Sequence, residues 1–232
     1  MFSVKSSFFP LQSFKNNTEN IAVIVGKSHF DGQLHSGIVF KYKEEVKVIH
    51  LAFHKRLYLE NESDFVSHND GYHWVKTVDI PLPRQIAIAA FCRRIYNLSN
   101  IRPIAYGFNY ENSRFTNEGY FILGKNEIGL TCASFVLAVF HESKVPLIDI
   151  SQWVSREDDA TYREMVLAFI KTKADESNNE DLKKHYQKMS QEKVIFRYRP
   201  EEVAVSSSYS IRPQPFDVIS TDALILKQHL LQ

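Results

Sequence analysis

Cys132 stands where a helix is expected to begin, in the segment NEIGLTCASFVLAVF. Gly129 closes the preceding segment and Thr131 is a favourable N-cap residue, so Cys132 falls in the first helical turn. Unpartnered N–H groups and the positive end of the helix dipole stabilise a thiolate there, and they can donate to a developing oxyanion. The position is that of a cysteine nucleophile, although a small buried cysteine on an apolar helix face would occupy the same place.

Cys92 offers a comparison within the same chain. It lies between Phe91 and Ile95 on the apolar stripe of another predicted helix, with no helix start and no histidine beside it. We therefore expect Cys92 to be a core residue. Two cysteines are too few for a disulfide scaffold and are compatible with a reducing compartment.

Two consecutive predicted strands carry histidines, in HSGIVF and VIHLAFH. Side chains alternate along a strand, and a short hairpin loop places the His35 face and the His50 face on the same side of the sheet. His35 would then lie opposite or diagonal to His50, with Gly37 leaving room for a helix end to approach. We predict that His35 is the general base for Cys132 and that His50 orients its ring, with His54 as the alternative third residue.

Other roles for these imidazoles stay open at this point. His35 and His50 could be separate, hydrogen-bonded core residues. A zinc site could draw its ligands from His29, Asp31 and the three strand histidines, but none of the recognised ligand spacings is present. We therefore predict neither a metal nor a cofactor.

The surrounding elements predict an α+β fold. Short β-branched runs indicate strands at 21–25, 36–41, 46–53 and 72–80. Helical periodicity predicts helices at 84–97, 131–142, 156–171, 180–191 and 221–231. Strands followed by helices, without a βαβ alternation, favour an antiparallel sheet.

An irregular region, 101–129, separates the first two predicted helices around a short strand at 120–123. Long loops of this kind are often functional, and we name its Tyr106, Tyr110 and Tyr120 as candidates for a substrate pocket wall. The stretch FRYRPEEVAV near the C-terminus is either a binding strip or an ordinary helix start, with Pro200 at the first helical position.

Composition limits the classes of partner. The 232 residues are 44% hydrophobic, with 28 basic and 27 acidic side chains, so charge gives no case for nucleic acid or an anionic membrane. Neither a secretory signal nor an 18-residue apolar run is present, so we expect a cytoplasmic protein without an integral membrane segment. Export by a signal-independent machine stays possible.

Three of these segments together resemble the NlpC-type papain-like cysteine hydrolases in their circularly permuted form. HSGIVF is similar to the histidine strand, VIHLA to the third-residue strand and TCASFV to the nucleophile helix. The order His, His, Cys resembles the permuted branch, which includes YiiX-like bacterial amidases and the lecithin retinol acyltransferase group. The resemblance implies that Cys132 is the nucleophile, His35 the base and acid, and His50 the orienting residue.

We therefore expect one papain-like domain over 1–232, with an N-terminal arm (1–20), an antiparallel sheet packed on the nucleophile helix and a helical C-terminal elaboration (146–232). The expected activity is cleavage of an amide in a peptide, an isopeptide or a peptidoglycan stem. The alternatives are an acyl hydrolase or acyltransferase acting on a lipid or thioester, and an inactive interaction module.

Overall fold

The structure is a computed structural model that describes residues 4–29, 32–69, 71–110, 113–124 and 128–232. It belongs to the α+β class, with one six-stranded antiparallel sheet in the order β1-β6-β2-β3-β4-β5. The strands are β1 (Phe8–Pro10), β2 (Ile21–Lys27), β3 (Leu34–Tyr42), β4 (Glu45–Phe53), β5 (Arg56–Asn61) and β6 (His73–Val75). A small second sheet pairs β7 (Arg114–Phe115) with β8 (Phe121–Ile122).

The α-helices are α1 (Val4–Ser7), α2 (Glu62–His68), α3 (Leu82–Ser99), α4 (Cys132–Glu142), α5 (Glu157–Ser177), α6 (Glu180–Gln191), α7 (Pro200–Ser206) and α8 (Phe216–Leu231), and the 3₁₀ turns are η1 (Leu11–Asn16) and η2 (Ile150–Gln152). None of the helices within the described ranges combines the length and the apolar character needed to cross a bilayer.

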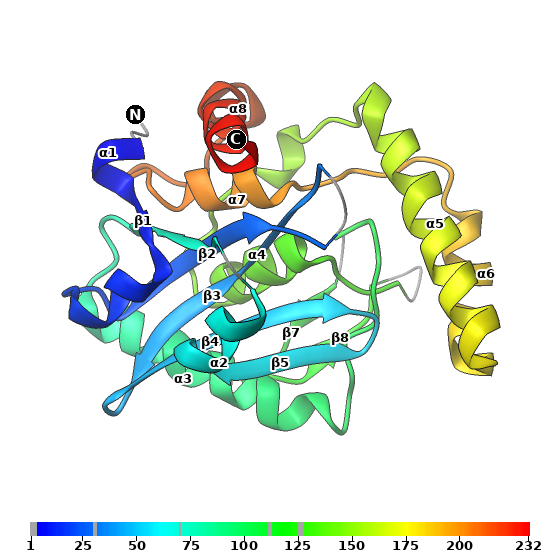
Figure 1. Ribbon diagram of the computed structural model, residues 1–232, viewed down its shortest axis with the longest axis horizontal. Coiled ribbons are helices and arrows are strands. Elements are labelled where there is room, and N and C mark those ends of the chain that lie inside the picture. The colour runs from blue at the N-terminus through cyan, green and yellow to red at the C-terminus, as the bar shows by residue number, and fades with distance from the viewer. Residues whose placement is uncertain (1–3, 30–31, 70, 111–112, 125–127) are drawn as a thin grey trace.

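The main sheet is covered on both faces, as Figure 1 shows. On one face Ile38, Phe40 and Ile49 pack against α3, α4 and α7. On the other face Val39 and Val48 pack against α2 and η1. All eight residues from 133 to 140 of α4 are buried, so this helix is central to the core rather than amphipathic.

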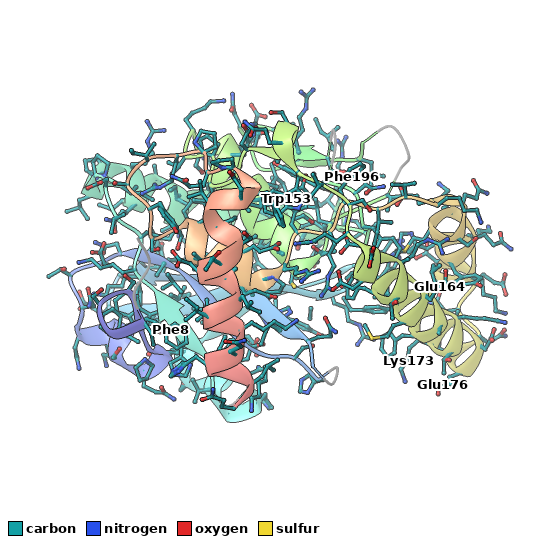
Figure 2. All side chains as sticks on the ribbon, turned by 90° about the horizontal axis from the view of Figure 1, so that it is seen from above. Phe8, Trp153, Glu164, Lys173, Glu176 and Phe196 are labelled. Carbon is teal, nitrogen blue, oxygen red and sulfur yellow. The ribbon has the colours of Figure 1, made fainter. Side chains whose placement is uncertain are left out.

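Of the C-terminal helices, α7 packs on the sheet, α8 packs on α7, and α5 and α6 pack on each other. Figure 2 shows α8 crossing the molecule between Phe8 of β1 and Trp153, and both ends of α8 make aromatic contacts there. The helix α5, which carries Glu164, Lys173 and Glu176, extends away from the sheet, and α6 packs along α5.

Several elements differ from the sequence prediction; α8, for example, begins at Phe216 rather than at residue 221. The expected strand 72–80 is reduced to β6, because the Thr77 hydroxyl donates to the Ile21 carbonyl and Asp79 takes a left-handed φ of 54°. The expected linker after residue 171 is helical as far as Ser177, and Asn178 ends α5 in the left-handed conformation. The N-terminal arm contributes β1, whose Phe8 pairs with Val75 at the sheet edge.

Candidate active site

Cys132 is the first residue of α4, as predicted. Thr131 is the N-cap in an extended conformation, and its hydroxyl accepts a hydrogen bond from the Ser134 N–H at 3.1 Å. The Ser134 hydroxyl accepts in return from the Thr131 N–H at 2.8 Å, which completes a capping box. The Cys132 N–H has no hydrogen-bond partner within the described residues, so it is a free donor at the helix start.

The segment that leads into α4 is held against residues 105–107. Leu130 N–H donates to the Ala105 carbonyl at 2.8 Å, and Gly129 lies so close that a Cβ atom there would be 1.6 Å from the Ala105 oxygen. Glycine is therefore required at position 129. This close approach places Tyr106 beside Cys132.

His35 and His50 are joined by a direct hydrogen bond. The His35 Nε2 atom lies 3.0 Å from His50 Nδ1, and His50 Nε2 lies 2.9 Å from the Glu60 carboxylate. Glu60 is on β5, a strand that the sequence analysis missed. The three side chains form a continuous hydrogen-bonded series that ends at His35, near the start of β3.

The Glu60 carboxylate fixes the tautomers of both rings. A carboxylate only accepts hydrogen bonds, so His50 Nε2 must carry a proton and, in the neutral ring, Nδ1 must accept. His35 Nε2 must then carry the proton that it donates to His50. The remaining nitrogen of His35, Nδ1, is left as a lone-pair acceptor, which is what a general base requires.

Burial keeps both histidines neutral. Desolvation lowers the pKa of His35 to about 4, with a smaller contribution from His29. Desolvation also lowers the pKa of His50 to about 4, assisted by the nearby His35 and opposed by Glu60. Both rings are therefore in the base form at neutral pH.

The pKa of the Cys132 thiol is shifted in the direction opposite to the one expected from its place at the helix start. Burial raises its pKa, and this effect outweighs the Ser36 and Ala133 N–H groups and the Arg197 charge, which favour the thiolate. The buried Ser36 hydroxyl also favours the thiolate, although it has no partner at regular hydrogen-bond geometry. The resting pair is a neutral thiol beside a neutral imidazole.

Two geometric expectations about the histidine strand are wrong. A Cβ atom at Gly37 would lie 2.9 Å from His50 Cβ and 2.8 Å from the Ile49 carbonyl oxygen, so Gly37 makes room for His50 and not for Cys132. The helix α4 packs on the Ile38 face of the sheet, opposite the His35 face. Cys132 and His35 meet at the end of β3, because His35 lies only one residue inside the strand.

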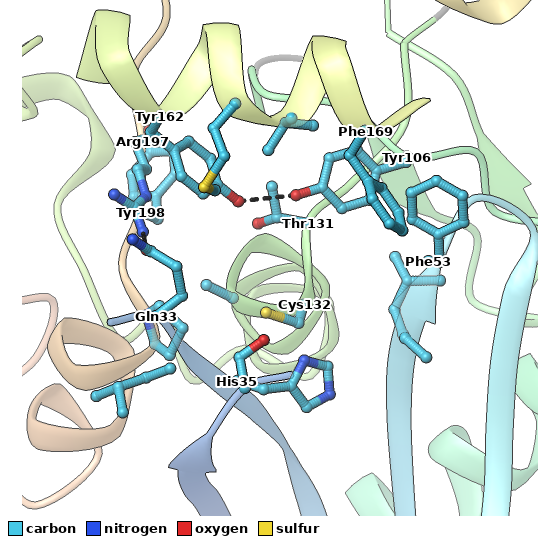
Figure 3. A pocket seen from close by; sticks show the side chains of 18 residues that line it. Gln33, His35, Phe53, Tyr106, Thr131, Cys132, Tyr162, Phe169, Arg197 and Tyr198 are labelled. Carbon is cyan, nitrogen blue, oxygen red and sulfur yellow. Dashed lines mark hydrogen bonds between the residues drawn. The ribbon is translucent and has the colours of Figure 1, made fainter. Parts of the chain in front are cut away.

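Cys132 and His35 line the same pocket, which has a volume of about 60 Å³. Figure 3 shows the Cys132 sulfur and the His35 ring pointing into it beneath α5. Opposite them, the Tyr106 and Tyr162 hydroxyls lie 2.8 Å apart. Other lining side chains are Gln33, Phe53, Phe169, Arg197 and Tyr198.

The other two tyrosines of the predicted pocket wall lie elsewhere. Tyr110 is buried with its ring edge-on to Tyr198, behind the pocket. The Arg102 guanidinium lies over the Tyr120 ring, 5.2 Å from the ring centroid. Neither lines the Cys132 pocket.

His54 does not contact His35. Its Nε2 atom lies 3.3 Å from the Asp181 carboxylate, and its Nδ1 accepts from the Tyr106 N–H at 3.3 Å. The His185 ring lies beside it, with the two ring centroids 4.0 Å apart and the planes tilted by 41°. This cluster connects the β4–β5 turn to α6 and holds Tyr106 in place.

Within the described ranges, no three His, Cys, Asp or Glu side chains gather as ligands of one metal ion would. Asp31, one of the candidate ligands, lies outside the described residues.

The sequence analysis missed Glu60 and Tyr162, and it included Arg197 only within the candidate binding strip FRYRPEEVAV, of which Arg197 and Tyr198 line the pocket while Pro200 begins α7. Glu60 could have been found from the alternation in RLYLEN, directly after a two-residue turn. Tyr162 carried no signal, because it looks like an ordinary residue of a charged helix.

Comparison with known proteins adds no assignment: no family model, curated protein or solved structure matches this chain.

Proposed function

We propose that the protein is a cysteine hydrolase that cleaves an amide through an acyl-enzyme on Cys132. The observation that carries the proposal is the hydrogen-bonded chain from Glu60 through His50 to His35, which ends in the pocket that Cys132 lines. Histidines in a protein core also need hydrogen-bond partners. Here, however, the carboxylate fixes the tautomers of two successive rings so that the last ring can accept a proton near a cysteine at a helix start, as in a nucleophile–base pair.

The reaction begins with transfer of the thiol proton from Cys132 Sγ to His35 Nδ1 as sulfur attacks the carbonyl carbon. The tetrahedral intermediate collapses when His35 returns that proton to the leaving nitrogen, which departs as the amine. His35 then takes a proton from water, whose oxygen attacks the thioester. The acid product leaves, and the proton on His35 restores the Cys132 thiol.

The negative charge that develops on the carbonyl oxygen needs donors. The free N–H of Cys132 is the first, and the start of α4 adds the positive end of its dipole. Removing one such donor in hydrolases costs about 100- to 1000-fold in rate.

We further propose that the chain is a permuted NlpC-type papain-like hydrolase. The support is threefold: His35, His50 and Cys132 follow one another in the permuted order, the cysteine begins a buried helix, and that helix packs on an antiparallel sheet.

A peptide fits the shape of the site better than an acyl chain. The Cys132 pocket is narrow, and it shares Phe53 and Phe169 with a groove of about 620 Å³ between the β4–β5 turn and α5. Charged and amide side chains line this groove beside the apolar Phe53, Phe169 and Leu182, and this mixed lining suits an extended peptide better than a hydrocarbon.

The test is a comparison of wild type with Cys132→Ala on peptidoglycan fragments, ubiquitin-like conjugates and phospholipids, with Cys92→Ala as the matched control. We expect amide cleavage by wild type and Cys92→Ala, no cleavage by Cys132→Ala, and a thioester on Cys132 trapped by hydroxylamine. Equal activity of all three proteins on every substrate would refute the mechanism.

A further inference from the structure

Arg197 is a cation fixed in the wall of the Cys132 pocket. It lies in the segment between α6 and α7, and only 8% of its surface is exposed. Its carbonyl accepts a hydrogen bond from Trp153 Nε1 at 3.0 Å, so its backbone is held in place.

No carboxylate pairs with this guanidinium in the part of the chain that the structure describes. Nearby acids are committed elsewhere: Glu202 pairs with Arg156, and Asp158 with Arg199. Arg197 lies 3.6 Å over the Tyr162 ring centroid, and its Nη2 donates to Gln33 Oε1 at 2.5 Å. A ring face and a neutral amide compensate a buried cation only in part, because removing a charge from water is costly without a counter-charge.

The unused donors of Arg197 open toward the pocket. A guanidinium has five N–H donors, of which Gln33 takes one. The other donors have no hydrogen-bond partner among the described residues, and the nitrogens without a partner are not fully buried. Figure 3 shows Arg197 and Gln33 on one wall, with Cys132 at the centre of the pocket.

We propose that Arg197 and Gln33 bind a carboxylate of the substrate next to the bond that Cys132 attacks. The inference rests on the proposed function, and it names the substrate class as an amide with an acidic group adjoining the scissile carbonyl. The carboxylate supplies the missing counter-charge, and the Gln33 amide N–H groups add a neutral donor. On the opposite wall, Phe53 and Phe169 offer only apolar contact.

A carboxylate suits this wall better than a phosphate. The guanidinium is planar and presents a fork that matches the two oxygens of a carboxylate. Arg197 is the one fixed cation among the lining residues, too little charge to balance a phosphate dianion.

Alkylation of Cys132 tests this subsite without knowledge of the substrate. Iodoacetate and iodoacetamide differ only in charge, and both react by displacement of iodide by the sulfur. We would measure their rates on Cys132 at pH 8 by peptide mass spectrometry, with glutathione as the reference thiol. N-iodoacetylglycine and its amide would extend the test to a carboxylate placed farther from sulfur.

For one of the two pairs, we expect the acid-to-amide rate ratio of Cys132 to exceed that of glutathione by about tenfold, the effect of one charge-assisted contact. Arg197→Met should reduce the ratio to the glutathione value. Both absolute rates should fall as well, because the Arg197 charge favours the Cys132 thiolate, so the acid-to-amide ratio is the readout. Arg197→Lys, which keeps the charge but not the fork, should keep part of the preference. Lys193→Met, which removes an exposed cation nearby, should change nothing.

Equal ratios for wild type and Arg197→Met with both pairs would overturn the subsite. A stronger Arg197-dependent preference for N-iodoacetylphosphoethanolamine would overturn the carboxylate assignment in favour of phosphate. Alkylation requires no turnover, so an Arg197-dependent ratio in a protein that hydrolyses nothing would refute the proposed function and leave the anion site standing. Hydrolysis without any charge preference would do the reverse.

Discussion

The Nε2 atom of His35 lies 3.0 Å from Nδ1 of His50, and this hydrogen bond determines which nitrogen of His35 can accept a proton. Since Glu60 accepts from the far side of His50, each ring has one possible neutral tautomer. The free lone pair of His35 therefore lies on Nδ1. A site built in this way depends on a residue two hydrogen bonds from the base.

Replacing Glu60 should disturb both tautomers. In Glu60→Gln the amide can donate to His50 Nε2 as well as accept from it, so the fixed order of donors is lost. We expect kcat/KM on the substrate found by the screen to fall about 10- to 100-fold, as for other outer residues that orient a functional imidazole. Nitrogen-15 NMR of the two imidazoles would show mixed tautomers without any need for substrate.

Glu44→Gln is the control for this variant, because Glu44 is exposed in the β3–β4 turn and makes no contact with the histidines. Unchanged imidazole nitrogen shifts in Glu60→Gln would contradict the orienting role, whatever its activity.

A side chain at Gly37 should separate the two histidines. The new Cβ atom would lie within 3.0 Å of Ile49 and His50, both fixed in the sheet, so the strands must shift. We expect Gly37→Ala to lose about 1–3 kcal/mol in the free energy of unfolding, as overpacked sites do. Acyl transfer through Cys132 should also fail, measured as loss of amide cleavage.

Val39→Ala is the matched control, since Val39 lies on the same face of β3 and its truncation destabilises the fold without touching the histidines. If Val39→Ala and Gly37→Ala lost stability and activity in equal proportion, the glycine would have no special role.

The sequence predicted the elements that local patterns determine. The N-cap at Thr131, the buried helix after it and the hairpin that brings His50 to His35 all follow from residue type and spacing. Helix packing is not local: the cysteine helix was expected on the histidine face and lies on the other. The reason is that His35 sits at the strand end, where a group on either side of the sheet can reach it.

Long-range contacts account for the functional residues that the sequence did not reveal. Arg197 reaches the pocket from 65 positions beyond Cys132, and nothing near it in the chain indicates that it meets Gln33. The pKa of Cys132 likewise depends on burial by distant segments, which outweighs the local effect of the helix start.

The resting thiol should be neutral, and alkylation can show it. Because burial raises the pKa of Cys132 and lowers that of His35 to about 4, no thiolate–imidazolium pair forms at neutral pH. The thiolate fraction, and with it the iodoacetamide rate, should rise continuously from pH 6 to pH 9. His35→Asn should leave this profile nearly unchanged. If the alkylation rate of wild type did not change between pH 5 and pH 8, and His35→Asn lost this pH independence, a preformed thiolate–imidazolium pair would be indicated instead.

The buried histidines should make the fold sensitive to acid. His35, His50 and His185 each have a pKa of about 4 in the folded chain, mainly through burial, against 6.5 as the ordinary value. Between these two values the unfolded chain binds protons that the folded chain does not. The free energy of unfolding therefore falls as pH falls through this window, by at most about 1.4 kcal/mol per pH unit for each histidine.

Urea unfolding between pH 4.5 and 7.5 would measure this slope. The double variant His35→Gln/His50→Gln shows how much of the slope comes from these two histidines. Two of the histidines that bind protons on unfolding are then absent, so its stability should depend less on pH, even if it is lower throughout. His141→Gln, which removes an exposed histidine, should keep the wild-type slope. Parallel profiles for wild type and the double variant would mean that the two rings are charged in the folded protein, and His35 could not then act as the base.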